Sequence, residues 1–118
     1  MKTLVLGASI HPERYSYKAI KLLRANGHEV IAVGLNGGEV ADVKITPTFP
    51  LNEKFDTLTM YLNPLHQKEY YNAILKTKPR RIIFNPGAEN DELKLLAQQN
   101  GIKTEEACTL VLLNTGQY

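Results

Sequence analysis

The sequence predicts a single-domain, three-layer α/β/α fold built around an open, mostly parallel β-sheet. Three observations support this prediction. A length of 118 residues is enough for one hydrophobic core and too short for two. Short apolar segments with strand character alternate with segments of helical periodicity. Turn residues, mainly Gly, Pro and Asn, separate these segments. We therefore treat residues 1–118 as one domain.

The first half of the chain predicts a strand, a loop, a helix and a second strand. Residues 3–6 (TLVL) are apolar without alternation, which is typical of a parallel strand covered on both faces. Residues 16–26 carry apolar side chains at helical spacing and end at Asn26-Gly27, a left-handed stop. Residues 28–33 (HEVIAV) form the next predicted strand, and the glycine-rich residues 34–38 form a turn.

The second half alternates strands and helices in the same way. The predicted strands are residues 40–45, 57–62, 81–84 and 102–105. The predicted helices are residues 64–75 and 89–100, and a terminal segment follows around residues 107–113. The buried face predicted for the first of these helices consists of Tyr70, Tyr71, Ile74 and Leu75. Strands alternating with helices of ten to twelve residues indicate a parallel sheet with helices on both faces.

Composition excludes several classes of function. The formal net charge is +2, and no block of like charge marks a nucleic-acid-binding tail, so no nucleic-acid partner is expected. Cys108 is the single cysteine, which leaves no disulfide framework and no thiolate cluster, and we expect a reducing cytoplasm. No segment approaches the roughly 18 apolar residues of a membrane span, so no membrane partner is expected either.

The architecture predicts where the binding site lies. In open parallel sheets, ligands bind beyond the carboxyl ends of the strands, where the winding direction reverses. The loops at that edge are residues 7–16, 34–38, 61–66 and 85–90. They contain most of the unusual residues of the chain.

The first of these loops, GASIHPERYS, suits a phosphate group. Gly7 allows the backbone to turn sharply and a ligand to approach the main chain. Ser9 contributes a hydroxyl, and Arg14 and Ser16 come just before the first helix, whose free N–H groups favour an anion. The alternative is that Gly7 serves only the turn, Ser16 only caps the helix and Arg14 is solvated.

Known nucleotide motifs narrow the ligand class. A G-x-G-x-x-G fingerprint would need glycines where Ser9 and Pro12 stand. The second strand does not end in the acidic residue that holds the ribose of a nicotinamide dinucleotide, and the Walker-type G-x-x-x-x-G-K-[ST] is absent. The sequence therefore favours a phosphorylated ligand that is neither an ordinary dinucleotide nor a hydrolysed triphosphate.

Three features together resemble a known family. They are GAS-x-x-P-x-R-x-S-x-K-A after the first strand, NPG-x-x-N late in the chain and a cysteine just after the last strand. The sequence resembles the small bacterial CoA-binding proteins over essentially its whole length. These proteins have the Rossmann-like CoA-binding fold that also occurs in the α subunit of succinyl-CoA synthetase. At the late turn, many larger members have W-x-Q-x-G, whereas this chain has FNPGAEN.

The resemblance implies a set of cofactor-binding residues. The phosphate loop is implied to contribute Gly7, Ala8, Ser9, Arg14 and Ser16. The resemblance places Gly34 and Asn36 near the adenosine half of the ligand and the loop from Tyr61 to Pro64, with Tyr61 as its contact residue, on another wall of the cleft. It is consistent with a far end of the cleft shaped by Asn85, Pro86, Gly87 and Asn90. No metal ligands and no catalytic residues are implied.

Three other residues, Arg80, Arg81 and Cys108, could be taken for ligand contacts or reactive groups but admit a simpler interpretation. Arg80 and Arg81 precede a predicted strand, so we expect them at its amino end, away from the cleft and solvated. Cys108 precedes the apolar residues 110–113 and is more economically a small buried hydrophobe than a reactive thiol.

Three functions remain open from the sequence. The first is a small-molecule-binding module that holds CoA or an acyl-CoA without catalysis of its own. The second is a small nucleotide-cofactor-dependent enzyme, an oxidoreductase or acyl transferase, that uses His11 or Cys108 with the loop 85–90. The third is a homodimer subunit or regulatory partner in which the tyrosine-rich helix at residues 66–75 forms an interface. Fold alone does not separate them.

Overall fold

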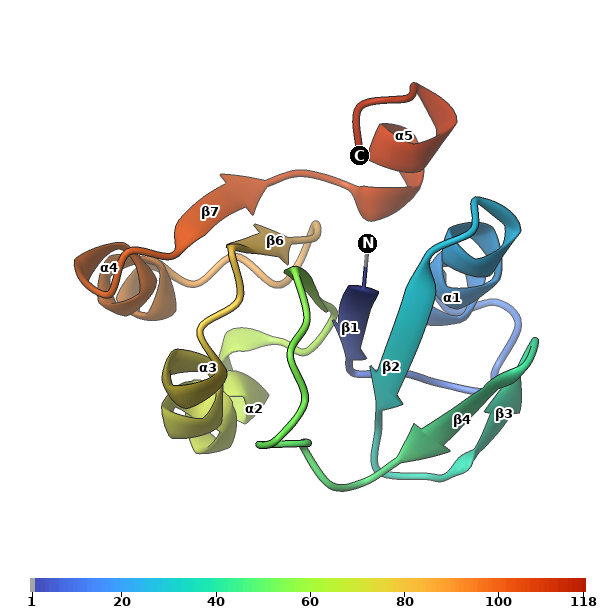
Figure 1. Ribbon diagram of the computed structural model, residues 1–118, viewed down its shortest axis with the longest axis horizontal. Coiled ribbons are helices and arrows are strands. Elements are labelled where there is room, and N and C mark those ends of the chain that lie inside the picture. Colours follow the sequence, from blue (N-terminus) through green and yellow to red (C-terminus); the bar gives the residue numbers. More distant parts are fainter. Residues whose placement is uncertain (1) are drawn as a thin grey trace.

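A seven-stranded sheet forms the centre of the computed structural model, which describes residues 2–118 (Figure 1). The strands are β1 (Lys2–Leu6), β2 (Glu29–Val33), β3 (Gly38–Val40), β4 (Val43–Thr46), β5 (Thr57–Met60), β6 (Arg81–Phe84) and β7 (Lys103–Glu106). Their order across the sheet is β3-β4-β2-β1-β5-β6-β7. All neighbouring strands run parallel except β3, which is antiparallel to β4. The predicted open, mostly parallel sheet is confirmed.

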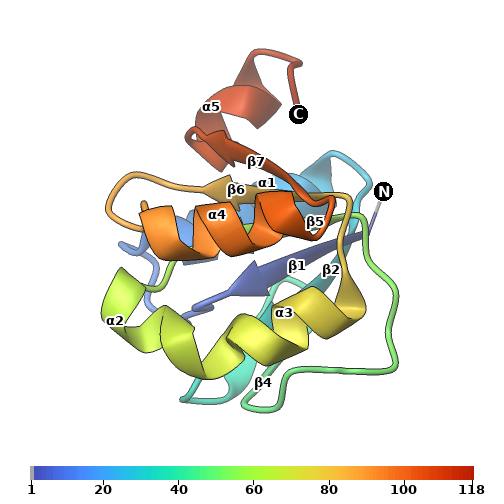
Figure 2. The same cartoon turned by 90° about the vertical axis from the view of Figure 1, so that its left-hand side faces the viewer.

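Helices cover both faces of this sheet. They are α1 (Tyr15–Ala25), α2 (Pro64–Gln67), the 3₁₀ turn η1 (Lys68–Tyr70), α3 (Tyr71–Thr77), α4 (Asp91–Gln99) and α5 (Thr109–Asn114). Figure 2 shows α3 and α4 in front of the strands, with α1 behind them. The alternation of side chains along β1 fits this arrangement. Leu4 and Leu6 pack in the cluster that contains Ile74 of α3, whereas Val5 packs with Ile20 of α1.

The two clusters account for the predicted three layers. The larger cluster joins the apolar side chains of β1, β5 and β6 to α3 and α4, and the smaller joins β1, β2 and the β3–β4 hairpin to α1 and α5. The core side chains Leu4, Val5, Leu58 and Ile82 are all 0% exposed. Strands that are apolar on both faces therefore have helices on both faces, as the sequence predicts.

One predicted strand was wrong. Residues 40–45 do not form a continuous strand but divide into β3 and β4, an antiparallel hairpin in which Val40 pairs with Val43. The two residues between them form the turn, and Ala41 adopts a left-handed conformation with φ of 54°. Val40 and Val43 are both buried and lie three residues apart, so the alternation of apolar and polar residues changes phase at the turn, a break that the prediction of one continuous strand overlooked.

The predicted helix at residues 64–75 exists but is not uniform. It consists of α2, η1 and α3 and extends to Thr77. Its buried face is the predicted one, because Ile74 is fully buried and Tyr70, Tyr71 and Leu75 pack against the larger cluster.

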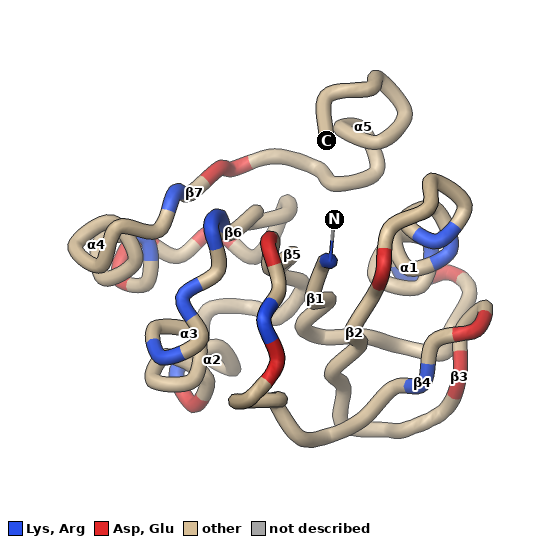
Figure 3. Tube along the Cα trace, viewed as in Figure 1, with Lys and Arg blue, Asp and Glu red and all other residues tan. Residues whose placement is uncertain are grey.

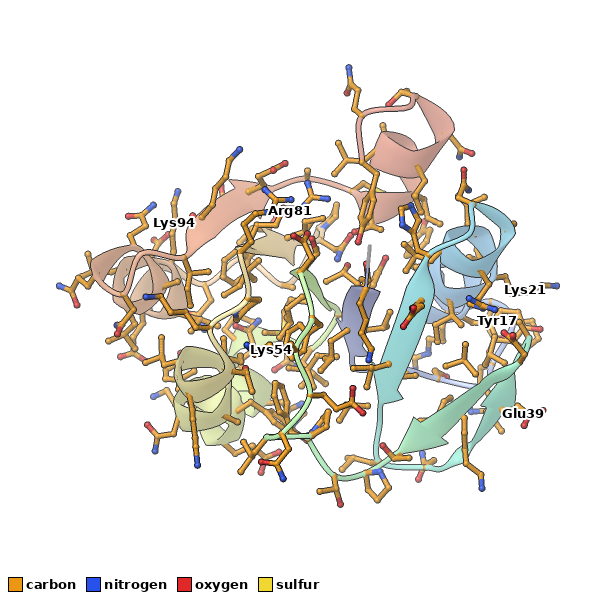
Figure 4. The ribbon with its side chains drawn as sticks, in the orientation of Figure 1. Tyr17, Lys21, Glu39, Lys54, Arg81 and Lys94 are labelled. Atoms are coloured by element: carbon orange, nitrogen blue, oxygen red, sulfur yellow. The ribbon has the colours of Figure 1, made fainter. Side chains whose placement is uncertain are left out.

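The expectation that Arg81 is solvated was also wrong. Arg81 begins β6 (Figure 4), is 4% exposed, and donates from Nη2 to the carbonyl oxygen of Tyr118 at 3.0 Å. Its Nε donates to Thr57 Oγ1 at 2.9 Å, and its Nη1 contacts Glu105 Oε1 at 3.3 Å. The guanidinium carbon lies 4.6 Å from the centre of the Tyr118 ring. Partners on three other segments allow the charge to be buried.

Charged side chains of both signs are interspersed along the trace (Figure 3). Arg80, which is exposed, pairs with Asp56 through an Nε–Oδ1 distance of 2.8 Å. Lys2 pairs with Glu53 at 2.7 Å, and Arg24 pairs with Asp42 at 2.7 Å.

The strand order places the reversal of winding between β1 and β5. After β1 the chain forms β2 on one side of it and then the β3–β4 hairpin, in which β4 lies beside β2 and β3 lies at the edge of the sheet. The chain then crosses to β5 on the other side of β1. A crevice therefore opens at the carboxyl ends of β1 and β5, which is where open α/β sheets bind ligands.

Candidate functional site

A cleft of 740 Å³ lies at this edge of the sheet. Loops that follow β1, β2 and β5 line it, together with one residue each from η1 and from the turn after β6. Its lining consists of Leu6, Gly7, Ala8, Ser9, Ile10, His11, Arg14, Tyr15, Ser16, Val33, Gly34, Leu35, Asn36, Tyr61, Leu62, Asn63, His66, Tyr70 and Pro86. We call this space the carboxyl-edge cleft. Its volume is typical of small-molecule sites.

Close backbone packing forms the floor of the cleft. The N–H groups of Gly7 and Ala8 both donate to the carbonyl oxygen of Val33 at 2.9 Å. Gly7 has φ of 97°, in the left-handed region that favours glycine. A Cβ on Gly34 would lie 2.3 Å from the carbonyl oxygen of Ala8. The loop after β1 therefore rests directly on the loop after β2, and Gly34 is required by that contact.

The amino end of α1 opens into the cleft without a capping side chain. Arg14 is the N-cap residue and makes no side-chain capping hydrogen bond, and the first turn holds no acidic residue. By contrast, Asn90 caps α4, whose first turn holds Asp91 and Glu92. Ser16 is the second residue of the helix and is 4% exposed, so the alternative that it caps the helix is wrong. The free N–H groups at the positive end of the α1 dipole are therefore available to an acceptor other than a capping side chain.

Arg14 differs from the other arginines of the chain. Arg24, Arg80 and Arg81 each contact a carboxylate, whereas no hydrogen bond or ion pair of the Arg14 side chain occurs within residues 2–118. The Arg14 side chain is exposed and lines the cleft. A permanent cation is therefore available beside the uncapped helix end.

Carboxylates are missing from the cleft. None of the described residues that line it is Asp or Glu, although the chain contains 12 of them. Glu29, Asp42 and Glu53 instead line a second cavity of 460 Å³ beside β2 and β4. Ser9 contributes a hydroxyl to the cleft and accepts a hydrogen bond from the His11 N–H at 3.1 Å. An anionic ligand would meet no like charge in the carboxyl-edge cleft.

Tyr61 follows β5 and lines the cleft on the wall that faces the loop after β1. It packs against the smaller hydrophobic cluster, which contains Val5 and Ile20. The hydroxyl is buried and has no hydrogen-bond partner in the described part of the chain. Burial is the main cause that raises the pKa of Tyr61 to about 12, and the nearby hydroxyls of Thr59 and Thr109 act in the opposite direction. Tyr61 therefore presents a neutral ring to the cleft.

Asn85 does not line the cleft. Its side chain is 3% exposed and donates from Nδ2 to Thr59 Oγ1 at 2.7 Å and to the Met60 carbonyl oxygen at 2.9 Å. Its Oδ1 accepts from the Thr109 N–H at 2.8 Å. These contacts occupy Asn85 in joining β5 and β6 to the amino end of α5.

Asn90 is engaged in the same way. Its Oδ1 accepts from the Leu93 N–H at 3.1 Å, and its Nδ2 donates to Gln67 Oε1 and to the Tyr71 hydroxyl, both at 2.8 Å. Of the four residues predicted at the late turn, Pro86 alone lines the cleft. Gly87 is exposed, and its N–H donates to Glu89 Oε1 at 2.9 Å.

The structure thus brings together most of the predicted cofactor residues. Those that line the cleft are Gly7, Ala8, Ser9, Arg14, Ser16, Gly34, Asn36, Tyr61 and Pro86. Asn85, Gly87 and Asn90 lie outside it. The resemblance already implied the loop that contains Leu62 and Asn63 as a wall of the cleft, and Tyr70 was predicted as a buried helix residue, but Tyr15, Leu35 and His66 were not named as contacts. Their position in the loops after the strands was the available signal. The chemistry of their side chains did not mark them as ligand contacts.

Cys108 is partly buried at the N-cap of α5 and does not line the cleft. Within residues 2–118, no three His, Cys, Asp or Glu side chains gather as a metal site would require. No helix among these residues combines the length and apolar character needed to cross a membrane.

Comparison with known proteins identifies the family of this chain. A crystal structure described as an uncharacterized protein is 47% identical, with a TM-score of 0.95, and the match covers 99% of this chain and 97% of the other. The fold is also that of a redesigned binding variant of PH1109 (21% identity, TM-score 0.87, covering 99% of this chain and 84% of the other). A Thermus thermophilus protein has the same fold (21% identity, TM-score 0.84, covering 99% and 90%). No curated protein matches at a significant level. The family model described as a CoA binding domain matches residues 1–114, and the chain therefore belongs to the CoA binding domain family.

Proposed function

We propose that this protein binds CoA or an acyl-CoA in the carboxyl-edge cleft and holds the ligand without transforming it. Membership of the CoA binding domain family supports a CoA-binding role. The observation that carries the proposal is the pairing of an uncapped α1 terminus with Arg14 in a cleft without carboxylates. A diphosphate bears negative charge that both groups favour.

The lining suggests how the ligand lies. The diphosphate would sit on Gly7, Ala8, Ser9, Arg14 and Ser16 at the amino end of α1. The adenosine half would extend toward Gly34 and Asn36, and exposed Leu35 offers apolar surface there. The pantetheine arm would pass Tyr61 and Pro86.

Asn85 and Asn90 would shape the far end of the cleft from outside. Asn85 fixes the strand ends beneath it, and Asn90 holds Gln67 of α2. Cys108 lies outside the lining, so the proposed binding does not use its thiol.

Thermal unfolding with and without ligands tests the proposal. A ligand that binds only the folded state at a hundredfold excess over Kd adds about 2.7 kcal/mol, which raises the Tm of a domain of this size by about 10 °C. We expect such a shift with CoA and acetyl-CoA, and a smaller one with ADP. Shifts with NAD or NADP alone, or with none of these ligands, would contradict the proposal.

A further inference from the structure

Two walls of the cleft meet above the point where the winding reverses. The Tyr61 N–H donates to the Leu6 carbonyl oxygen at 2.9 Å, and a Cβ on Gly7 would lie 3.1 Å from the Leu62 nitrogen. The segment after β5 therefore stands against the phosphate loop after β1. Both walls line the same cleft as the amino end of α1.

His66 is exposed on the second wall and lines the cleft from α2. The backbone around it is fixed on both sides. Asn63 Oδ1 accepts from the His66 N–H at 3.2 Å. Gln67, which is 0% exposed, donates from Nε2 to the carbonyl oxygens of Leu62 and Ala88, both at 2.8 Å. Asn90 Nδ2 completes this set by donating to Gln67 Oε1 at 2.8 Å.

Few side chains of the cleft can carry positive charge. In the described lining these are Arg14 and His11 on the first wall and His66 on the second. The bonds of Gln67 hold the turn that carries His66 before any ligand arrives, which lowers the ordering cost of binding. A ring N–H that is directed at a phosphate oxygen forms a charge-assisted hydrogen bond.

We infer that His66 is a second phosphate-binding residue, which donates a hydrogen bond to the ligand diphosphate from the wall opposite Arg14. This inference rests on the proposed function. The preferred ligands are then nucleotides whose diphosphate contacts both walls of the cleft. A monophosphate would reach one wall and lose the second contact.

Calorimetric titration of His66→Gln with CoA and with ADP tests this assignment. We expect both ligands to bind about fivefold to tenfold more weakly than to the unchanged protein, as for loss of one hydrogen bond to a charged group. His66→Lys should restore most of the affinity, because the ammonium group is also a donor. Lys68→Gln is the matched control, since Lys68 is exposed two residues away and does not line the cleft. It should bind both ligands within about twofold of the unchanged protein.

Three other outcomes of these titrations separate failure of the His66 inference from failure of the proposed function. Equal affinities of His66→Gln and the unchanged protein for CoA would overturn the inference while leaving the proposed function intact. A loss for CoA but not for ADP would also overturn it, since ADP has the diphosphate but lacks the pantetheine arm and the 3′-phosphate, and His66 would then contact one of those groups. If the unchanged protein binds neither ligand, the proposed function fails, and this inference fails with it. Ligand-free melting of the variants verifies that they fold.

Discussion

Asn85 joins the strand ends to the last helix through the backbone of Thr109. Its Oδ1 accepts the Thr109 N–H at 2.8 Å, while its Nδ2 donates to Thr59 and to the Met60 carbonyl oxygen. Thr59 and Thr109 also hydrogen-bond to each other through their hydroxyls at 2.8 Å. One buried amide thus satisfies polar groups from β5 and α5 at once.

Replacing that amide should destabilise the fold. Asn85→Leu leaves the buried N–H of Thr109 without its acceptor and removes the amide donor to Thr59 Oγ1 and the Met60 carbonyl oxygen, and we expect a loss of about 3 kcal/mol in the free energy of unfolding. Urea unfolding measures this loss. Asn72→Leu is the matched control because Asn72 is exposed on α3, and it should change stability by no more than about 0.5 kcal/mol. Equal unfolding midpoints for the two variants would refute the structural role.

Arg14→Ala should weaken ligand binding without weakening the fold. The Arg14 side chain lines the cleft and contacts no carboxylate within the described residues, so its removal breaks no ion pair seen in the structure. We expect about tenfold weaker binding of CoA. Calorimetric titration gives the affinity and thermal melting gives the stability.

Lys94→Ala controls for the loss of one positive charge. Lys94 lies on α4, outside the cleft lining (Figure 4). Its affinity for CoA should stay within about twofold of the unchanged protein. If both variants lose affinity equally, net charge rather than a contact of Arg14 explains the result.

Gly34→Ala should be poorly tolerated. The added Cβ would approach the Ala8 carbonyl oxygen to 2.3 Å, a distance that forces the two loops apart. We expect a loss of at least about 2 kcal/mol in stability, together with weaker CoA binding, because the phosphate loop shifts. Gly37→Ala tests the same change three residues later, where the nearest atom is 3.8 Å away. Similar melting temperatures for the two variants would contradict the close packing at Gly34.

Stability should fall in acid partly because of Asp56. The hydrogen bond from Arg80 lowers the pKa of Asp56, burial opposes the shift, and the Thr57 hydroxyl lowers the pKa further. A lowered pKa in the folded state means that the carboxylate stabilises the fold above its unfolded pKa, about 3.9, and loses this contribution as pH falls through the lower folded value.

Asp56→Asn isolates that contribution. The variant should be less stable than the unchanged protein at pH 7, and the difference should shrink below about pH 4, where the carboxylate becomes protonated. Urea unfolding at several pH values measures this difference. A constant difference across the whole range would mean that the Asp56 charge does not stabilise the fold.

Much of the fold was predictable because burial on both faces makes residues 4–6 of β1 and 82–84 of β6 continuously apolar, and the buried β5 alternates Thr with Leu and Met. The order of strands and helices follows from that pattern, and the site loops follow from the order. The β3–β4 reversal was hard to predict, because an alanine rather than Gly or Asn occupies the left-handed turn position, and the remaining signal is a change of phase in the apolar alternation between Val40 and Val43. The burial of Arg81 depends on Thr57, Glu105 and Tyr118, which are distant in sequence.

For the site, the sequence by itself determined that the connection from β1 to α1 lines the cleft, because Gly7, Ser9, Arg14 and Ser16 all lie in that one strand-to-helix connection. The tertiary structure decided which later residues share the cleft with them. Asn85 and Asn90 have the chemistry of ligand contacts, yet their hydrogen bonds are used within the fold. His66 is marked in the sequence only by its place in the loop 61–66, and it reaches the cleft because β5 lies beside β1. Which polar groups remain available to a ligand depends on which partners folding supplies, and those partners come from the whole chain.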